Sequence, residues 1–142
     1  MTNQVVERPS REYEDADWPM VEDWWLEHHE GRPLARQILA PIGLVAYDED
    51  GPAMVGFAYF IEERPVAILE YFIGRPGMTL AQANRTFSRL VRDLELVCLA
   101  NGKIIVTAAV PATIARYAEK NHGYSDDGEF NILTKILPWA QE

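Results

Sequence analysis

Cysteine, long apolar runs and sequence repeats are scarce or missing in this chain of 142 residues. The single cysteine, Cys98, has no partner for an intrachain disulfide and cannot build a zinc site from several thiolates. No apolar run reaches the roughly 18–20 residues that cross a bilayer. The polar stretch 1–11 also lacks the apolar centre of a signal peptide. We therefore expect a cytoplasmic protein with no membrane partner.

Basic residues are few compared with acidic ones. The chain has 13 Lys and Arg against 22 Asp and Glu, which gives a net charge of −9. The excess is concentrated in residues 1–30, which hold nine acidic and two basic side chains. Such a chain repels nucleic-acid phosphates, so we expect no nucleic-acid partner. The acidic N-terminal part either attracts a cationic substrate or is a solvated face.

Apolar and aromatic residues, in contrast, are plentiful. Hydrophobic residues make up 48% of the chain, which includes four Trp, six Tyr and five Phe. This composition excludes a disordered chain. The length fits one domain of roughly 100–200 residues, and we expect a single domain over 1–142.

Helix-like and strand-like patterns alternate along the chain. Helix starts are indicated at Asp17, with Pro19 in the first turn, and at Thr79, and a helix stop at Asn101-Gly102. The predicted helices cover 18–29, 34–39, 80–100 and 111–122. The predicted strands cover 5–8, 42–47, 53–61, 66–73 and 103–107, with one or two more within 124–137. This order predicts an α+β fold, with a mixed, mostly antiparallel sheet of six to seven strands and helices on both faces.

The longest predicted helix carries an apolar stripe at helical spacing. Its members are Leu80, Ala83, Phe87, Leu90, Val91, Leu94, Val97 and Cys98. We expect this stripe to pack on the sheet.

Several segments, taken in order, carry a family resemblance. They are Ile42–Tyr47, Asp50-Gly51, Val55-Gly56-Phe57, the apolar strand Val66–Ile73, the long helix, and Ala118–Tyr124. Together they resemble the GNAT superfamily of N-acyltransferases over nearly the whole chain. The start of the long helix, Gly77-Met78-Thr79-Leu80, resembles divergent bacteriophage and bacterial members.

The resemblance implies that acetyl-CoA is the co-substrate and that a small-molecule or protein amine is the acceptor. In such enzymes acyl-CoA lies between the third strand of the meander and the strand after the long helix. A helix N-terminus there holds the pyrophosphate with unpaired N–H donors. The residues implied to bind the cofactor are Tyr71, Phe72, Ile73, Arg75, Gly77, Met78 and Thr79.

The pyrophosphate loop departs from the family pattern Arg/Gln-x-x-Gly-x-Gly/Ala. Here the loop fits at Gly77 and, less closely, at Ala81, and Pro76 removes an N–H donor. The alternative function is therefore a catalytically inactive GNAT-like protein with a structural or interaction role, which has lost this loop.

Two residues are candidates for proton transfer. Glu70 is the predicted base, because its position in an apolar strand raises the pKa of a carboxyl group. The alternatives are that it pairs with an arginine or points into solvent. In the family the acid is a tyrosine four residues before the glycine of the late element. That position holds Glu119, and Tyr117, two residues earlier, is the candidate acid or a helix-surface tyrosine. A bulge near Tyr71 would supply the N–H donors for the oxyanion.

The first predicted helix is rich in tryptophan and histidine. Trp18, Trp24 and Trp25 either face a substrate groove or a homodimer interface, or pack in the core. His28 and His29 are adjacent, so they do not form the i, i+4 pair of a helical metal site. We therefore expect no metal.

Overall fold

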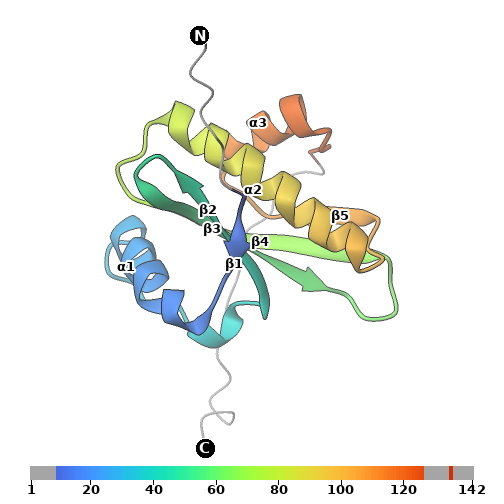
Figure 1. Cartoon of the computed structure of the whole chain (residues 1–142), viewed down its shortest axis with the longest axis horizontal. Helices are drawn as coiled ribbons and strands as arrows, with labels where there is room; N and C mark the ends of the chain where they lie inside the picture. Colours follow the sequence, from blue (N-terminus) through green and yellow to red (C-terminus); the bar gives the residue numbers. More distant parts are fainter. Residues whose placement is uncertain (1–8, 127–134, 136–142) are drawn as a thin grey trace, which may run out of the picture.

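The computed structural model describes residues 9–126 and residue 135. Within these residues, three α-helices and two short 3-10 helices accompany five strands (Figure 1). The strands are β1 (Arg11–Glu12), β2 (Ile42–Asp48), β3 (Gly51–Phe60), β4 (Val66–Gly74) and β5 (Ile105–Ala108). The helices are η1 (Asp15–Asp17), α1 (Trp18–His28), η2 (Arg36–Ile38), α2 (Leu80–Ala100) and α3 (Ala112–His122). The α+β class is therefore confirmed.

The five strands form one sheet in the order β1-β2-β3-β4-β5. All neighbours are antiparallel except β4 and β5, which are parallel. The sheet within the described residues thus has five strands and not the six to seven expected. The strand predicted at 5–8 lies outside the described residues, as does most of 124–137. The described first strand is β1, at residues 11–12.

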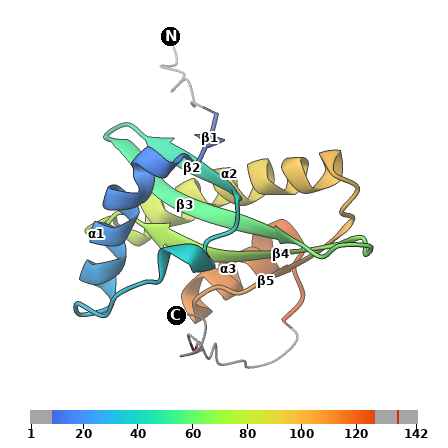
Figure 2. The ribbon, with the colours of Figure 1, turned by 90° about the horizontal axis from the view of Figure 1, so that it is seen from below.

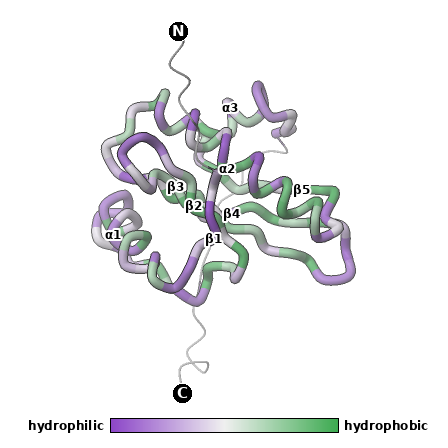
Figure 3. The backbone as a smooth tube through the Cα atoms, in the orientation of Figure 1, coloured by the Kyte–Doolittle hydropathy of each residue, from purple (hydrophilic) through white to green (hydrophobic). Residues whose placement is uncertain are grey.

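Local signals explain most element boundaries. Gly51 adopts a φ of +115° in the tight turn between β2 and β3, where Asp50 N–H donates to Asp48 Oδ1 over 2.9 Å. Figure 3 shows this turn as hydrophilic and the central strands as largely apolar. Asp17 precedes α1 as expected, but its side chain does not cap the helix. Its carboxylate instead binds the Arg11 guanidinium through two contacts of 2.7 Å.

Two further expectations need correction. The short helix predicted over 34–39 is the single 3-10 turn η2, because Ala35 and Leu39 on either side have extended backbone. Leu80 does not join the apolar stripe of α2, since its position in the first turn leaves it 64% exposed. The remaining stripe is confirmed at five fully buried positions: Phe87, Leu90, Val91, Leu94 and Cys98.

The sheet separates two hydrophobic cores. One contains the stripe of α2 together with Leu69 of β4 and Ala118 of α3. The other contains Val21 of α1 and Phe57 of β3, with Trp25 at its border. Figure 2 shows the strands from β1 at the top to β5 at the bottom, with α3 next to β5. Helices therefore cover both faces of the sheet, as the sequence predicts.

Candidate functional site

The parallel strand β5 pairs over its whole length with the first half of β4. Their register runs from Val66 opposite Ile105 to Leu69 opposite Ala108. Ala109 N–H donates to the Leu69 carbonyl over 3.0 Å. Within the described residues no pairing continues beyond this point, so the second half of β4 faces an opening.

A groove of about 2220 Å³ occupies this opening. Its walls come from α1 and the segment after it, the second half of β4, β5 and the inner side of α3. Pockets for drug-sized ligands usually measure about 300–1,000 Å³. The groove is therefore larger than such a pocket.

A β-bulge shapes β4 where the groove begins. Phe57 pairs with Glu70 and Val55 pairs with Ile73, so β4 has one residue more than β3 between these pairs. Tyr71 lies within the bulge and has a φ of +56°, which is uncommon for a residue other than glycine. The bulge that the sequence analysis required for an oxyanion site is therefore present.

The bulge changes which face of the sheet each side chain of β4 reaches. Glu70 lies opposite Phe57, which belongs to the α1-side core, and Tyr71 packs against the same core. Phe72 points to the other face, where it meets Phe87 with ring centroids 5.2 Å apart. Consecutive residues of a regular strand point to opposite faces. The bulge thus brings Glu70 and Tyr71 together on the α1 side.

Glu70 lines the groove and has no basic partner among the described residues. Burial raises its pKa above the usual value. None of the ion pairs among residues 9–126 includes Glu70. The alternative of a structural pair with an arginine therefore has no support in the described part of the chain.

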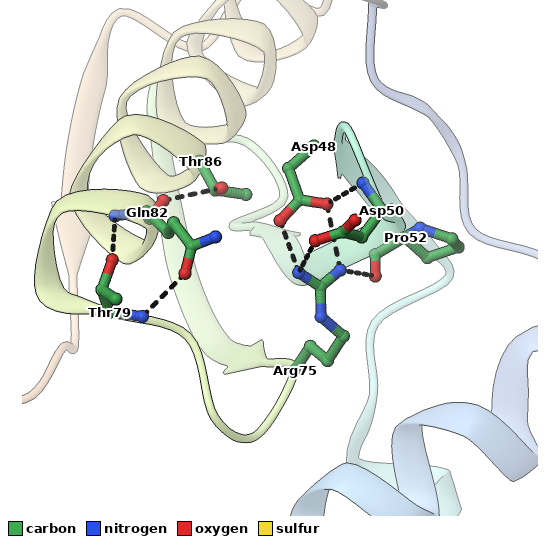
Figure 4. Close-up of polar contacts among 7 residues, drawn as sticks. All are labelled: Asp48, Asp50, Pro52, Arg75, Thr79, Gln82 and Thr86. Carbon is green, nitrogen blue, oxygen red and sulfur yellow. Dashed lines mark hydrogen bonds and ion pairs between the residues drawn. The ribbon is translucent and has the colours of Figure 1, made fainter.

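The loop after β4 holds Arg75 in a network of its own (Figure 4). Its Nη2 lies 2.5 Å from Asp48 Oδ2, and its Nη1 lies 3.1 Å from Asp48 Oδ1. Nη1 also donates to the Pro52 carbonyl over 2.9 Å, and Asp50 lies 4.0 Å from Nη2. Arg75 lines the groove, but its guanidinium is directed to the β2–β3 turn. These contacts engage both terminal nitrogens of the Arg75 guanidinium.

The N-terminus of α2 is closed by a reciprocal capping box (Figure 4). Gln82 N–H donates to Thr79 Oγ1 over 3.1 Å, and Thr79 N–H donates to Gln82 Oε1 over 2.8 Å. Two of the donors that a helix N-terminus offers to an anion are therefore already used. Thr79 does not line the groove, whereas Gly77 and Met78 do. The N-cap prediction for Thr79 is confirmed.

Tyr117 belongs to α3, its hydroxyl contacts α2, and it is not part of the groove lining. Its hydroxyl is 2.7 Å from Ser88 Oγ, which is also 2.9 Å from His122 Nε2. His122 does line the groove. The sequence analysis missed Ser88 and His122 because no spacing rule connects residues on two different helices. Tyr124, in the late element, also lines the groove and donates its hydroxyl to Glu95 over 3.0 Å.

The α1 side of the groove is aromatic. Trp25 packs against Tyr71 with centroids 6.1 Å apart, and Tyr71 packs against Tyr59 at 6.5 Å. Of the three tryptophans singled out in the sequence, Trp25 lines the groove, whereas Trp18 and Trp24 pack against the α1-side core. Next to Trp25, His28 Nε2 lies 2.7 Å from the Gly74 carbonyl oxygen.

Within the described residues, no three His, Cys, Asp or Glu side chains gather closely enough to hold a metal ion. No helix in the described part of the chain combines the length and apolar character needed to span a membrane.

Several solved structures with a similar fold are acetyltransferases. A Trypanosoma brucei acetyltransferase has a TM-score of 0.65 at 15% identity and covers 89% of this chain and 98% of its own. A putative acetyltransferase from Arthrobacter has a TM-score of 0.61 at 20% identity, over 96% and 99% of the two chains. The aminoglycoside N-acetyltransferase AAC(6')-Iy, solved with CoA, has a TM-score of 0.60 at 11% identity, over 90% and 99%. No protein-family model and no curated protein matches the sequence.

These likenesses, together with the bulged β4 and the gap beside β5, define the fold. The chain has the fold of the GNAT acetyltransferases. The match covers about nine-tenths of the chain at low sequence identity, so the fold is established by geometry and not by shared sequence.

Proposed function

We propose that this chain is an acyl-CoA-dependent N-acyltransferase that transfers an acetyl group to an amine. One observation carries the proposal: β4 bulges at Tyr71 where β5 diverges from it. The bulge leaves peptide groups of β4 facing a groove and sets the Glu70 carboxyl beside them. The similar fold of an aminoglycoside N-acetyltransferase solved with CoA supports acetyl-CoA as the co-substrate.

Acylation of an amine first requires removal of a proton, because an ammonium ion has no lone pair for attack. In this proposal Glu70 accepts that proton, and its raised pKa suits a general base. The amine nitrogen then bonds to the carbonyl carbon of the thioester. Peptide N–H groups of the bulge stabilise the oxyanion. The carbon–sulfur bond breaks, and the second amine proton leaves to solvent.

The departing thiolate needs a proton. In this proposal the role expected of Tyr117 belongs to the hydrogen-bonded group Tyr117–Ser88–His122, because His122 is the member that lines the groove. Gly77, Met78 and the first turn of α2 supply the remaining N–H donors for the pyrophosphate, since Arg75 and the capping box are engaged.

A second candidate function rests on those same engaged groups. The Arg75–Asp48 ion pair and the Thr79–Gln82 capping box occupy the donors that a pyrophosphate would use. This arrangement favours a GNAT-like protein that has kept the groove and lost the acyl donor. Such a protein would bind a ligand without transferring a group.

Binding of acetyl-CoA separates the two functions. A ligand at 100 times its dissociation constant stabilises the folded state by about 2.7 kcal/mol. For a domain of this size that raises the melting midpoint by roughly 5–10 °C. We expect such a shift, and a calorimetric signal, for the unmodified protein. Absence of both at millimolar acetyl-CoA would favour the non-catalytic function.

Two alanines of α3 provide a matched pair for this experiment. Ala115 lines the groove and is half-buried, whereas Ala112 is exposed and lies outside the groove lining. We expect Ala115→Trp to abolish the shift by filling the groove and Ala112→Trp to retain it. Equal shifts for both variants would place the acetyl-CoA site elsewhere.

A further inference from the structure

The α1 side of the groove combines a carboxyl group with fixed aromatic rings. The bulge brings Glu70 and Tyr71 to this side as consecutive residues. The Tyr71 ring is tilted by 48° to that of Trp25 and by 55° to that of Tyr59. The three rings are therefore tilted to one another and do not form a flat stack.

Hydrogen bonds and a stacking contact fix the positions of the Trp25 and Tyr59 rings. Trp25 Nε1 donates to the Arg32 carbonyl over 3.0 Å, and its indole stacks on His29 with centroids 3.7 Å apart. The Tyr59 hydroxyl donates to the Ile38 carbonyl. Burial and the nearby Glu70 and Tyr71 raise the pKa of Tyr59 to about 12, so its ring stays neutral. The surface is therefore preorganised before any ligand binds.

The charge of the groove favours a cation. Among the described residues, its lining includes four carboxyl groups and two guanidinium groups: Glu70, Glu95, Glu119, Asp126, Arg32 and Arg75. The Arg75 charge is neutralised by Asp48 outside the groove. This net negative charge attracts a cation to the part of the groove beside Glu70.

We propose that Glu70, Trp25 and Tyr71 form the recognition site for the acceptor, and that the acceptor is a protonated primary amine on an aromatic or apolar body. An ammonium ion meets the carboxylate of Glu70 on one side and the π faces of Trp25 and Tyr71 on the other. The apolar body of the ligand packs on the same rings. This inference rests on the proposed acyltransferase function, because it assigns the acceptor of that reaction.

Binding of simple amines tests the assignment without any acyl donor. Phenethylamine is the probe, and its controls are 2-phenylethanol, which is neutral, and phenylacetate, which is an anion. We expect calorimetry to detect phenethylamine at millimolar concentration and to find both controls at least tenfold weaker. Equal affinity for either control, or no binding of phenethylamine, would overturn the proposal.

Variants then locate the site. Glu70→Gln keeps the shape of the side chain and removes its charge, and Trp25→Leu keeps an apolar group and removes the ring. Each is expected to weaken phenethylamine binding about tenfold or more. Trp24→Leu is the matched control, because Trp24 neighbours Trp25 on α1 but lies outside the groove lining. It is expected to change the affinity less than twofold. Unchanged affinity in Glu70→Gln overturns the proposal even if Trp25→Leu fails to fold.

Phenethylamine binding is measured without acetyl-CoA, so it tests the amine site separately from the acyltransferase function. Amine binding without acetyl-CoA binding would leave the amine site standing and remove the acyltransferase function. Suppose instead that the protein binds acetyl-CoA and acetylates amines that lack an aromatic or apolar body, with no preference for phenethylamine. The acyltransferase function would then stand, and the proposed amine site would be wrong.

Discussion

Arg75, on the loop after β4, makes a two-point contact with Asp48 at the end of β2. The Arg75 side chain is 24% exposed and that of Asp48 is 9% exposed. The pair ties the candidate phosphate loop to the β2–β3 turn (Figure 4). A residue that the sequence assigned to cofactor binding thus has a structural partner 27 positions earlier in the chain.

We expect Arg75→Ala to destabilise the fold and to leave acetyl-CoA binding nearly unchanged. Removal of the guanidinium leaves the Asp48 carboxylate without its strongest donor, which costs about 1–3 kcal/mol. Urea unfolding measures the loss, and calorimetry measures the affinity. Arg85→Ala, at an exposed position of α2, is the control and should alter neither quantity. A large drop in acetyl-CoA affinity with unchanged stability would instead make Arg75 a phosphate ligand.

Acid should weaken the fold through two carboxylates. Hydrogen bonds from Arg75 lower the pKa of Asp48, and those from Arg11 lower the pKa of Asp17. A lowered folded-state pKa stabilises the protein above the unfolded value of about 3.9. This stabilisation is lost as the pH falls through the folded pKa. We expect the free energy of unfolding to fall below about pH 4, with a shallower fall in Asp48→Asn. The same pH dependence in both proteins would refute this role of Asp48.

Glu70 should matter more for catalysis than Tyr117. Glu70→Gln removes the base and is expected to lower kcat with an amine acceptor by roughly 10²–10⁴-fold. Its stability should stay the same or rise slightly, because burial disfavours the charged carboxylate. Tyr117→Phe should reduce kcat less, since the Tyr117 hydroxyl contacts Ser88 and not the groove.

Glu62→Gln is the control for these rates, because Glu62 is exposed in the turn between β3 and β4. If Glu70→Gln kept full turnover and melted at a lower temperature, Glu70 would be a structural residue. The base would then be water or another carboxylate.

Gly43 should resist substitution because of a close approach within the sheet. A Cβ atom at this position would lie 2.5 Å from Cδ1 of Phe57, which is fully buried. We expect Gly43→Ala to destabilise the protein by about 1–3 kcal/mol, measured by urea unfolding. In a Phe57→Leu background the same change should cost less, because the smaller side chain leaves room. Equal costs in both backgrounds would show that Phe57 is not the obstacle.

Much of the fold follows from local sequence signals. The turn at Asp50-Gly51, the cap at Thr79 and the stop at Asn101-Gly102 mark element ends through backbone geometry that few residues satisfy. The stripe of α2 is predictable because helical periodicity places its members on one face. The order of elements then carries the resemblance to the GNAT superfamily, which the structural matches support.

The sequence also identified Glu70 as the candidate base, because a lone carboxyl group in an apolar strand is costly to bury. Other features of the site depend on contacts between segments that are distant in the sequence. The bulge that places Tyr71 beside Glu70 is a mismatch between β3 and β4, and no pattern within β4 alone reveals it. The pairing of Arg75 with Asp48 and of Tyr117 with Ser88 likewise joins separate elements. Local periodicity determined the elements, whereas tertiary packing decided which polar groups face the groove and which are engaged elsewhere.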